Sequence, residues 1–239
     1  MADDTRLNAI LWGAALGDAL GATVRGLSLH QIKAAYGLQG VRVLPDDAQP
    51  GPHTAQLLTL AADKTIQPVM GGNPAACVAG LAYINHADDA ALFRALADVV
   101  PDAQPATLAA TLAAGYMVAA TMQGIHVNEY VNKTMTFCDG ISDVFDTTLL
   151  RIGHVLGWVD EDAALKHIGT GQSPVDTVVM ALYCVLRYDD DFIACVGRAA
   201  TTDGDSAAIA AIAGAIMGVR LGDVNLLPDA WIARLDLDI

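Results

Sequence analysis

Apolar residues recur at the spacing of an α-helix along most of the chain. In residues 8–22, Ile10, Ala14, Gly17 and Gly21 fall on one helical face. Because three of these residues are small, a second helix can approach that face closely. The same spacing occurs in residues 54–63, 75–85, 91–100, 106–122, 176–188, 205–221 and 229–235. The pattern therefore predicts an all-α protein whose alanine-rich and glycine-rich helices pack tightly.

The strict alternation typical of β-strands is rare. Residues 40–45 (GVRVLP) form the one segment that predicts a short strand. Between the helical segments, glycine, proline and aspartate cluster in short turns, none of them long enough to link two domains. We therefore expect one domain that spans residues 1–239.

Composition narrows the classes of protein further. A hydrophobic content of 54% and a charged content of 17% rule out a disordered chain. The net charge of −14 argues against nucleic acid or an anionic membrane surface as a partner. No apolar run reaches the roughly 18 residues of a membrane span, and the acidic start lacks the basic region of a signal peptide. The four cysteines have no CxxC spacing, which fits a reducing compartment. We therefore expect a cytoplasmic protein.

Two aspartates stand immediately before the apolar segment 206–221. Asp203 and Asp205 flank Gly204, and Ser206 follows. Either Asp205 or Ser206 is a natural N-cap for a helix, which needs no further explanation. However, one cap satisfies the helix, and two neighbouring carboxylates repel each other. A hard cation such as Mg²⁺ relieves that repulsion and takes oxygen ligands, so the turn is also a candidate metal site.

Four separated segments share one family pattern. They are residues 11–24 (LWGAALGDALGATV), 71–81 (GGNPAACVAGL), 167–192 (HIGTGQSP and the helix after it) and 201–235 (TTDGDSAA through LLPDAWIARL). In order and spacing these segments resemble the ADP-ribosylglycohydrolase family, including its dinitrogenase reductase-activating glycohydrolase-like members. The resemblance implies an orthogonal bundle of helices around a central cleft. In that cleft, two Mg²⁺ ions help to hydrolyse the bond between ADP-ribose and a protein side chain or small group.

The resemblance also implies which residues hold the metal ions. Asp203, Asp205 and Ser206 match the family's C-terminal ligands. The other ligands belong to a Thr-Asp-Asp-Thr segment at the start of a second helix. Here Gly51, Pro52 and His53 stand where the family has Thr, Asp and Asp, and only Thr54 matches. Since proline has no donor atom and histidine is a poor ligand for Mg²⁺, the N-terminal half of the metal site is lost.

A further departure from the family pattern lies just after the first helical segment. Arg25 replaces the glutamate that the family uses near its metal site. A cation there repels Mg²⁺, or it pairs with Asp203 or Asp205 and substitutes for the missing ion. The retained residues then hold Mg²⁺ only at reduced occupancy, or not at all.

Other residues are candidates for ligand contacts. Gly169 and Gly171 lie in a glycine loop that precedes a helix, where free N–H groups can hold phosphate. Asn73 belongs to the segment that matches the family's Gly-Asn-Gly-Ala stretch. His53 forms a transition-metal site if the fold brings it to Asp203 and Asp205.

The roles of two further sets of carboxylates are left open by the sequence. Asp18 lies within the first helical segment and needs hydrogen-bond partners if it is buried. A loop shift can bring another carboxylate to the turn, from Asp46, Asp47, Asp143 or Asp146.

Three hypotheses follow. The first is a degenerate family member that binds ADP-ribose, a related nucleotide or an ADP-ribosylated protein, with lost or weak hydrolase activity. The second is an active metal-dependent hydrolase of ADP-ribosyl bonds with a remodelled centre. The third is a non-catalytic interaction protein whose cleft is closed, which pairing of Arg25 with Asp205 favours.

Overall fold

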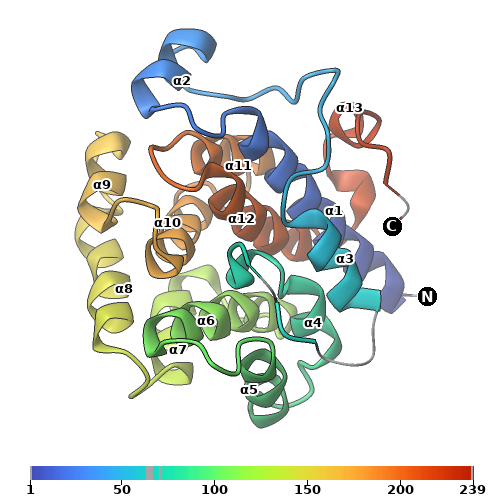
Figure 1. Ribbon diagram of the computed structural model, residues 1–239, viewed down its shortest axis with the longest axis vertical. Helices are drawn as coiled ribbons and strands as arrows, with labels where there is room; N and C mark the ends of the chain where they lie inside the picture. The colour runs from blue at the N-terminus through green and yellow to red at the C-terminus, as the bar shows by residue number, and fades with distance from the viewer. Residues whose placement is uncertain (1, 63–66, 70, 238) are drawn as a thin grey trace.

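The computed structural model describes residues 2–62, 67–69, 71–237 and 239. Within these ranges all regular structure is helical, as the sequence predicts (Figure 1). The α-helices are α1 (Ala2–Thr23), α2 (Leu29–Tyr36), α3 (Thr54–Ala62), α4 (Ala79–Ile84), α5 (Asp89–Asp98), α6 (Pro105–Met122), α7 (Tyr130–Phe137), α8 (Asp143–Val155), α9 (Glu161–Ile168), α10 (Pro174–Arg187), α11 (Phe192–Ala200), α12 (Ser206–Leu221) and α13 (Asp229–Ile232). Short 3₁₀ segments are Pro74–Ala76, Val127–Glu129 and Val224–Leu226. Asp63, the last residue of the helix predicted over 54–63, lies outside the described residues.

The predicted strand at residues 40–45 is wrong. This segment is a loop that runs between α2 and α3. Val41 and Leu44 are fully buried, whereas Val43 is 62% exposed. The Val41 N–H donates to the Thr201 hydroxyl at 3.2 Å instead of to a neighbouring strand. The apolar pattern therefore reflects a loop that anchors two side chains in the core.

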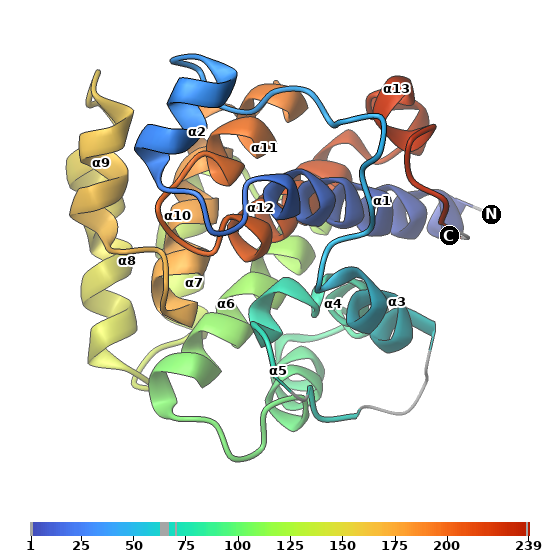
Figure 2. The same ribbon diagram turned by 45° about the horizontal axis from the view of Figure 1, so that its top comes forward.

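The α1 and α12 helices lie side by side at the centre of the fold (Figures 1 and 2). Glycines make this approach close: a Cβ atom at Gly17 would lie 2.0 Å from the Ala210 carbonyl oxygen, and one at Gly21 would lie 2.3 Å from the Ser206 carbonyl oxygen. The prediction of a small-residue face on the first helix is confirmed. As a consequence, the N-terminus of α12 lies beside the C-terminal turn of α1.

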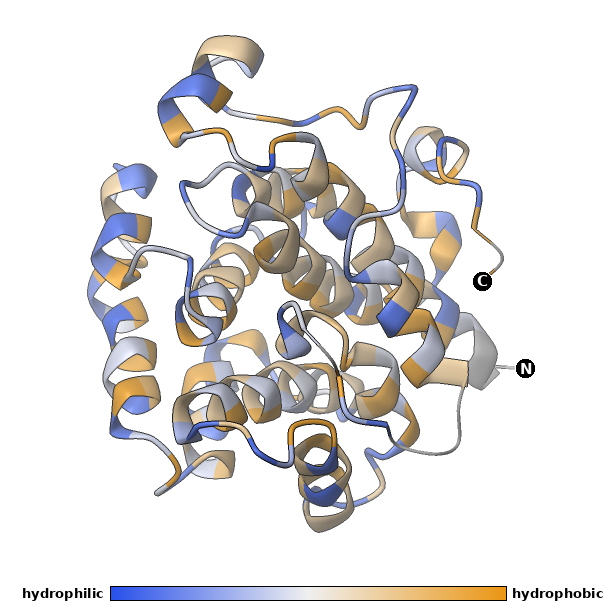
Figure 3. Cartoon of the chain, in the orientation of Figure 1, coloured by the Kyte–Doolittle hydropathy of each residue, from blue (hydrophilic) through white to orange (hydrophobic). Residues whose placement is uncertain are grey.

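One hydrophobic cluster joins most of the helices. In Figure 3, α6 and α12 carry few hydrophilic residues, whereas α8 and α9 at the periphery show both colours along their length. The α6 helix is 18 residues long and apolar enough to cross a membrane, contrary to the expectation that no run has this length. However, 67% of it is buried inside the molecule, as in the core helix of a globular protein.

Candidate functional site

The turn before α12 is held by its own hydrogen bonds. Asp205 is the N-cap of α12, since its side chain accepts from the Ala208 N–H at 3.2 Å. Its own N–H donates to the Gly171 carbonyl at 2.8 Å. Ser206 is buried, and its hydroxyl lies 3.4 Å from the Thr202 carbonyl that accepts from it. Of the two predicted caps, Asp205 therefore fills the role.

Asp203 connects this turn to α2. Its Oδ1 atom accepts a hydrogen bond from the Leu29 N–H at 2.6 Å, and Leu29 is the first residue of α2. The Asp203 carbonyl accepts from the Gln172 side-chain amide at 3.0 Å. One carboxylate oxygen of Asp203 thus satisfies a helix N–H group that would otherwise lack an intrahelical partner.

The glycine loop packs directly against the same turn. A Cβ atom at Gly204 would lie 2.5 Å from the Gly171 Cα atom, so both loops need glycine at this contact. Asp176 Oδ2 accepts from the Thr170 N–H at 2.8 Å, from the Thr170 hydroxyl at 3.0 Å and from the Gly171 N–H at 3.2 Å. Since these N–H groups already have a carboxylate partner, they are not free to hold phosphate.

The start of α3 is capped by a residue from α1. Asp18 is 1% exposed. Its Oδ2 atom accepts from the N–H groups of His53 and Thr54 and from the Thr54 hydroxyl, each at 2.8 Å. Its Oδ1 atom lies 2.9 Å from His53 Nδ1. Gly51 passes so close that a Cβ atom there would lie 2.2 Å from Asp18 Cγ.

Asn73 also has local partners. It is 6% exposed, and its amide donates to the Thr177 hydroxyl at 2.7 Å. Its side-chain oxygen accepts from the Ala75 N–H at 3.2 Å, which caps the 3₁₀ segment Pro74–Ala76. This residue therefore ties the segment before α4 to α10, and in this arrangement its amide is engaged within the protein.

Asp203 and Gln172 line two hollows. The first, of about 520 Å³, is lined by the α1–α2 connection with Arg25 and Ser28, and by Gly204 and Asp205 of the turn. Arg25 is exposed there, and no ion pair within the described ranges joins it to Asp203 or Asp205.

The second hollow, of about 430 Å³, extends toward α9, α10 and α11. Leu165, Met180 and Gly169 line it, together with the buried Arg198. Arg198 Nη2 lies 3.0 Å from the Asp162 carboxylate. Sequence reasoning missed Arg198, which lies alone in an apolar helix, and it missed Asp176, although the Ser-x-x-Asp pattern of residues 173–176 is a helix-start signal.

The residues present do not fit a pair of Mg²⁺ ions. Within the part of the chain that the structure describes, no three His, Cys, Asp or Glu side chains lie close enough together to hold a metal ion. His53 is engaged by Asp18 instead of by the turn. The four other candidate carboxylates do not line either hollow: they are Asp46, Asp47, Asp143 and Asp146. Of these, Asp46 pairs with Arg234 at 2.7 Å.

Comparison with known proteins agrees with this architecture. A sequence model of the ADP-ribosylglycohydrolase family matches residues 61–238, so the chain belongs to that family. Its fold is similar to that of a solved structure described as an ADP-ribosylglycohydrolase-related protein complex, with a TM-score of 0.69 and 18% identity over 98% of this chain and 93% of that one. A search of curated proteins found no match. The family match begins within α3, beyond its first turn.

Proposed function

We propose that this protein binds ADP-ribose or a related nucleotide, alone or attached to a protein, without hydrolysing it efficiently. The observation that carries the proposal is the bonding of Asp18. Both oxygens of this carboxylate are engaged by His53 and Thr54 at the start of α3. The resemblance implies metal-binding aspartates at that helix start, and here a structural cap takes their place.

Loss of hydrolysis follows from the same geometry. Cleaving the glycosidic bond requires an activated water molecule and a stabilised leaving group. The turn offers Asp203 and Asp205, but each of them accepts a hydrogen bond from a backbone N–H. No third carboxylate or histidine within the described residues joins them in a metal-sized group. This protein therefore lacks the set of ligands that would hold a divalent cation and activate a water molecule at the turn before α12.

Arg25 supports binding of a nucleotide. Its exposed guanidinium lines the hollow of about 520 Å³ beside the turn, and the Ser28 and Gln172 side chains line it too. Guanidinium forms paired, charge-assisted hydrogen bonds with phosphate. Arg25 also offsets the negative charges of Asp203 and Asp205, which otherwise repel a diphosphate. Binding through Arg25 does not require Mg²⁺.

Calorimetric titration with ADP-ribose tests the proposal. One series contains Mg²⁺ and a second contains a chelator, and the affinity is expected to be the same in both. The Arg25→Gln variant should bind at least tenfold more weakly. The matched control is Arg6→Gln, which removes an exposed arginine from a different surface and should leave the affinity unchanged.

Two other results would overturn the proposal. Binding that requires Mg²⁺, together with release of ADP-ribose from an ADP-ribosyl-arginine substrate, would support an active hydrolase with a remodelled centre. Absence of binding in both series would support a non-catalytic interaction protein. The hydrogen bond from the Leu29 N–H to Asp203 favours the interaction protein as the second candidate function, since it holds the start of α2 against the turn.

We place this function in the cytoplasm. The four cysteines are all unpaired and buried, as expected of a protein in a reducing compartment. An ADP-ribosylated protein in the same compartment is then the natural partner, and pull-down with an ADP-ribosylated peptide against its unmodified form tests it.

A further inference from the structure

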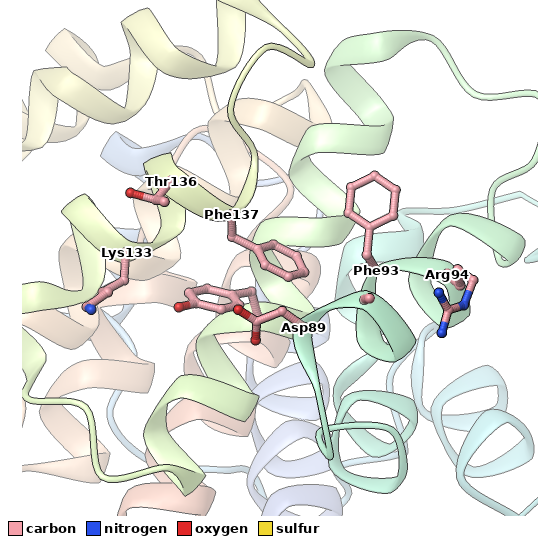
Figure 4. A pocket seen from close by; sticks show the side chains of 8 residues that line it. Asp89, Phe93, Arg94, Lys133, Thr136 and Phe137 are labelled. Atoms are coloured by element: carbon pink, nitrogen blue, oxygen red, sulfur yellow. The ribbon is translucent and has the colours of Figure 1, made fainter.

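A separate cavity lies between α5, α6 and α7. It has a volume of about 540 Å³, and Tyr116 is among its lining residues. Figure 4 shows Phe93 and Phe137 in the same lining. None of its lining residues belongs to the two hollows beside Asp203. The residues that line this cavity are therefore distinct from those of the candidate site at α12.

Aromatic rings gather here although the chain contains few. Aromatic residues make up 5% of the sequence, yet three helices each contribute one ring to this cavity. Tyr116 and Phe137 are stacked, with ring centroids 4.3 Å apart and an interplanar angle of 18°. Phe93 lies 6.0 Å from Phe137 and is tilted by 58°. Tyr116 is buried, while Phe93 and Phe137 are only partly buried, so their rings offer apolar surface to a ligand.

The charges around these rings favour an anion. Arg94 and Lys133 are exposed, and neither has an ion-pair partner among the described residues. In Figure 4 they lie at opposite ends of the ring cluster, with Asp89 between them. Acidic residues outnumber basic ones by 27 to 13 in this chain. Two unpaired cations on one cavity therefore create a positive region on an otherwise acidic protein.

We propose that this cavity binds a small planar aromatic anion. The ring of the ligand packs against Phe93 and Phe137, and its acidic group interacts with Arg94 or Lys133. A volume of about 540 Å³ is within the range of small-molecule sites, which combine apolar walls with a few polar groups. Burial, followed by the nearby Asp89 and Cys138, raises the pKa of Tyr116. A tyrosine phenol is already neutral at pH 7, and this shift keeps it neutral at higher pH, so it does not repel the anion.

Calorimetric titration with a matched pair of probes tests this proposal. The probes are 1-naphthoate and 1-naphthalenemethanol, which share the ring system and differ in charge. We expect 1-naphthoate to bind at least tenfold more tightly at low ionic strength, with an affinity that falls as salt is added. Failure of 1-naphthoate to bind, or equal affinities for the two probes, would overturn the proposal.

Charge variants locate the binding to this cavity. Loss of either cation, in Arg94→Gln or Lys133→Gln, or of both together should weaken binding of 1-naphthoate at least fivefold and leave binding of the alcohol unchanged. Loss of the nearby carboxylate, in Asp89→Asn, should strengthen binding of 1-naphthoate. Phe93→Leu keeps an apolar side chain but removes a ring, so it should weaken both probes. The control is Lys166→Gln, which removes an exposed lysine from the hollow near Arg198. If Lys166→Gln weakens binding of 1-naphthoate and neither Arg94→Gln nor Lys133→Gln does, the ligand binds elsewhere and the inference is wrong.

Discussion

Asp18 caps the start of α3 by accepting hydrogen bonds from both the N–H and the hydroxyl of Thr54 at 2.8 Å. The two residues are 36 positions apart in the sequence. A cap usually comes from the residue just before the helix, but here that residue is His53, whose own N–H also donates to Asp18. An aspartate in the C-terminal part of α1 thus caps the start of α3.

Removal of this cap should destabilise the protein. Asp18→Ala leaves the buried N–H of His53 without its acceptor and leaves the Thr54 N–H only its long hydrogen bond of 3.4 Å to the Gly51 carbonyl, and we expect a loss of about 2–4 kcal/mol in the free energy of unfolding. Asp18→Asn keeps an acceptor and should cost less. Urea unfolding followed by circular dichroism measures both, with the exposed Asp47→Ala as the control. An Asp18→Ala variant as stable as the parent would show that water replaces the carboxylate.

The long helices with continuous apolar sequence were predictable, whereas the more polar helices and the short apolar helix α11 were not. The long core helices α1, α6, α10 and α12 follow directly from apolar spacing. The sequence pattern did not predict α2, α7, α8, α9 or α11. Several of these have side-chain caps, such as Ser28 with Gln31 at the start of α2. In α2, α7, α8 and α9 the apolar residues cover only one face, which is a weaker signal than a helix buried on all sides.

Replacement of glycine by alanine should have opposite effects on stability where α1 packs on α12 and on the exposed surface of α8. A Cβ atom at Gly17 would lie 2.0 Å from the Ala210 carbonyl oxygen, and backbone cannot turn aside as a side chain can. Gly17→Ala should therefore cost about 3 kcal/mol or more in the free energy of unfolding. Gly153 is exposed in α8 with no other atom within 4 Å of an added Cβ. Gly153→Ala should stabilise by about 0.5–1 kcal/mol.

Thermal unfolding of the two variants compares them directly. The melting temperature should fall for Gly17→Ala and rise slightly for Gly153→Ala. If both substitutions lower it by the same amount, helix packing at Gly17 is looser than the distances indicate.

The candidate site was predicted as a set of residues but not as a set of contacts. The sequence identifies Asp203, Asp205 and Ser206, and the fold places them at the start of α12. It does not reveal that Leu29 donates to Asp203 or that Asp176 occupies the glycine loop. These contacts join residues from different helices, and their pairing depends on how α2 and α10 pack. Spacing within one segment carries no such information.

Buried thiols predict how stability changes at alkaline pH. Burial raises the pKa of Cys138 and of Cys184 from about 9 to about 12. Above pH 9 the unfolded chain loses these protons and the folded protein keeps them, so the free energy of unfolding falls as pH rises. It should be constant with respect to these groups below pH 9. From there it should decline by up to about 1.4 kcal/mol per pH unit for each thiol.

Urea unfolding between about pH 8 and 9.5, under a reductant, measures this decline while most tyrosines of ordinary pKa, about 10, are still protonated. The Cys184→Val variant keeps the buried apolar volume and removes one titrating group, so its decline should be shallower. Identical slopes for parent and variant would mean that Cys184 titrates alike in the folded and unfolded chains.

The alignment of residues 51–53 with the family's Thr-Asp-Asp residues predicts that a variant with acidic residues restored there gains metal binding. The variant Arg25→Glu/Pro52→Asp/His53→Asp introduces one carboxylate into the hollow lined by Asp203 and Asp205 and two at the start of α3, and the hydrogen bond from the His53 ring to Asp18 is lost. Crowded carboxylates repel one another and are stabilised by a divalent cation. We therefore expect Mn²⁺ binding at micromolar concentration, detected by electron paramagnetic resonance, in the variant but not in the parent. The control is Arg6→Glu, which makes the same change of charge as Arg25→Glu at a different exposed arginine and should bind no ion. If the triple variant folds and binds no more Mn²⁺ than the parent, then Gly51–His53 is not the counterpart of the Thr-Asp-Asp segment.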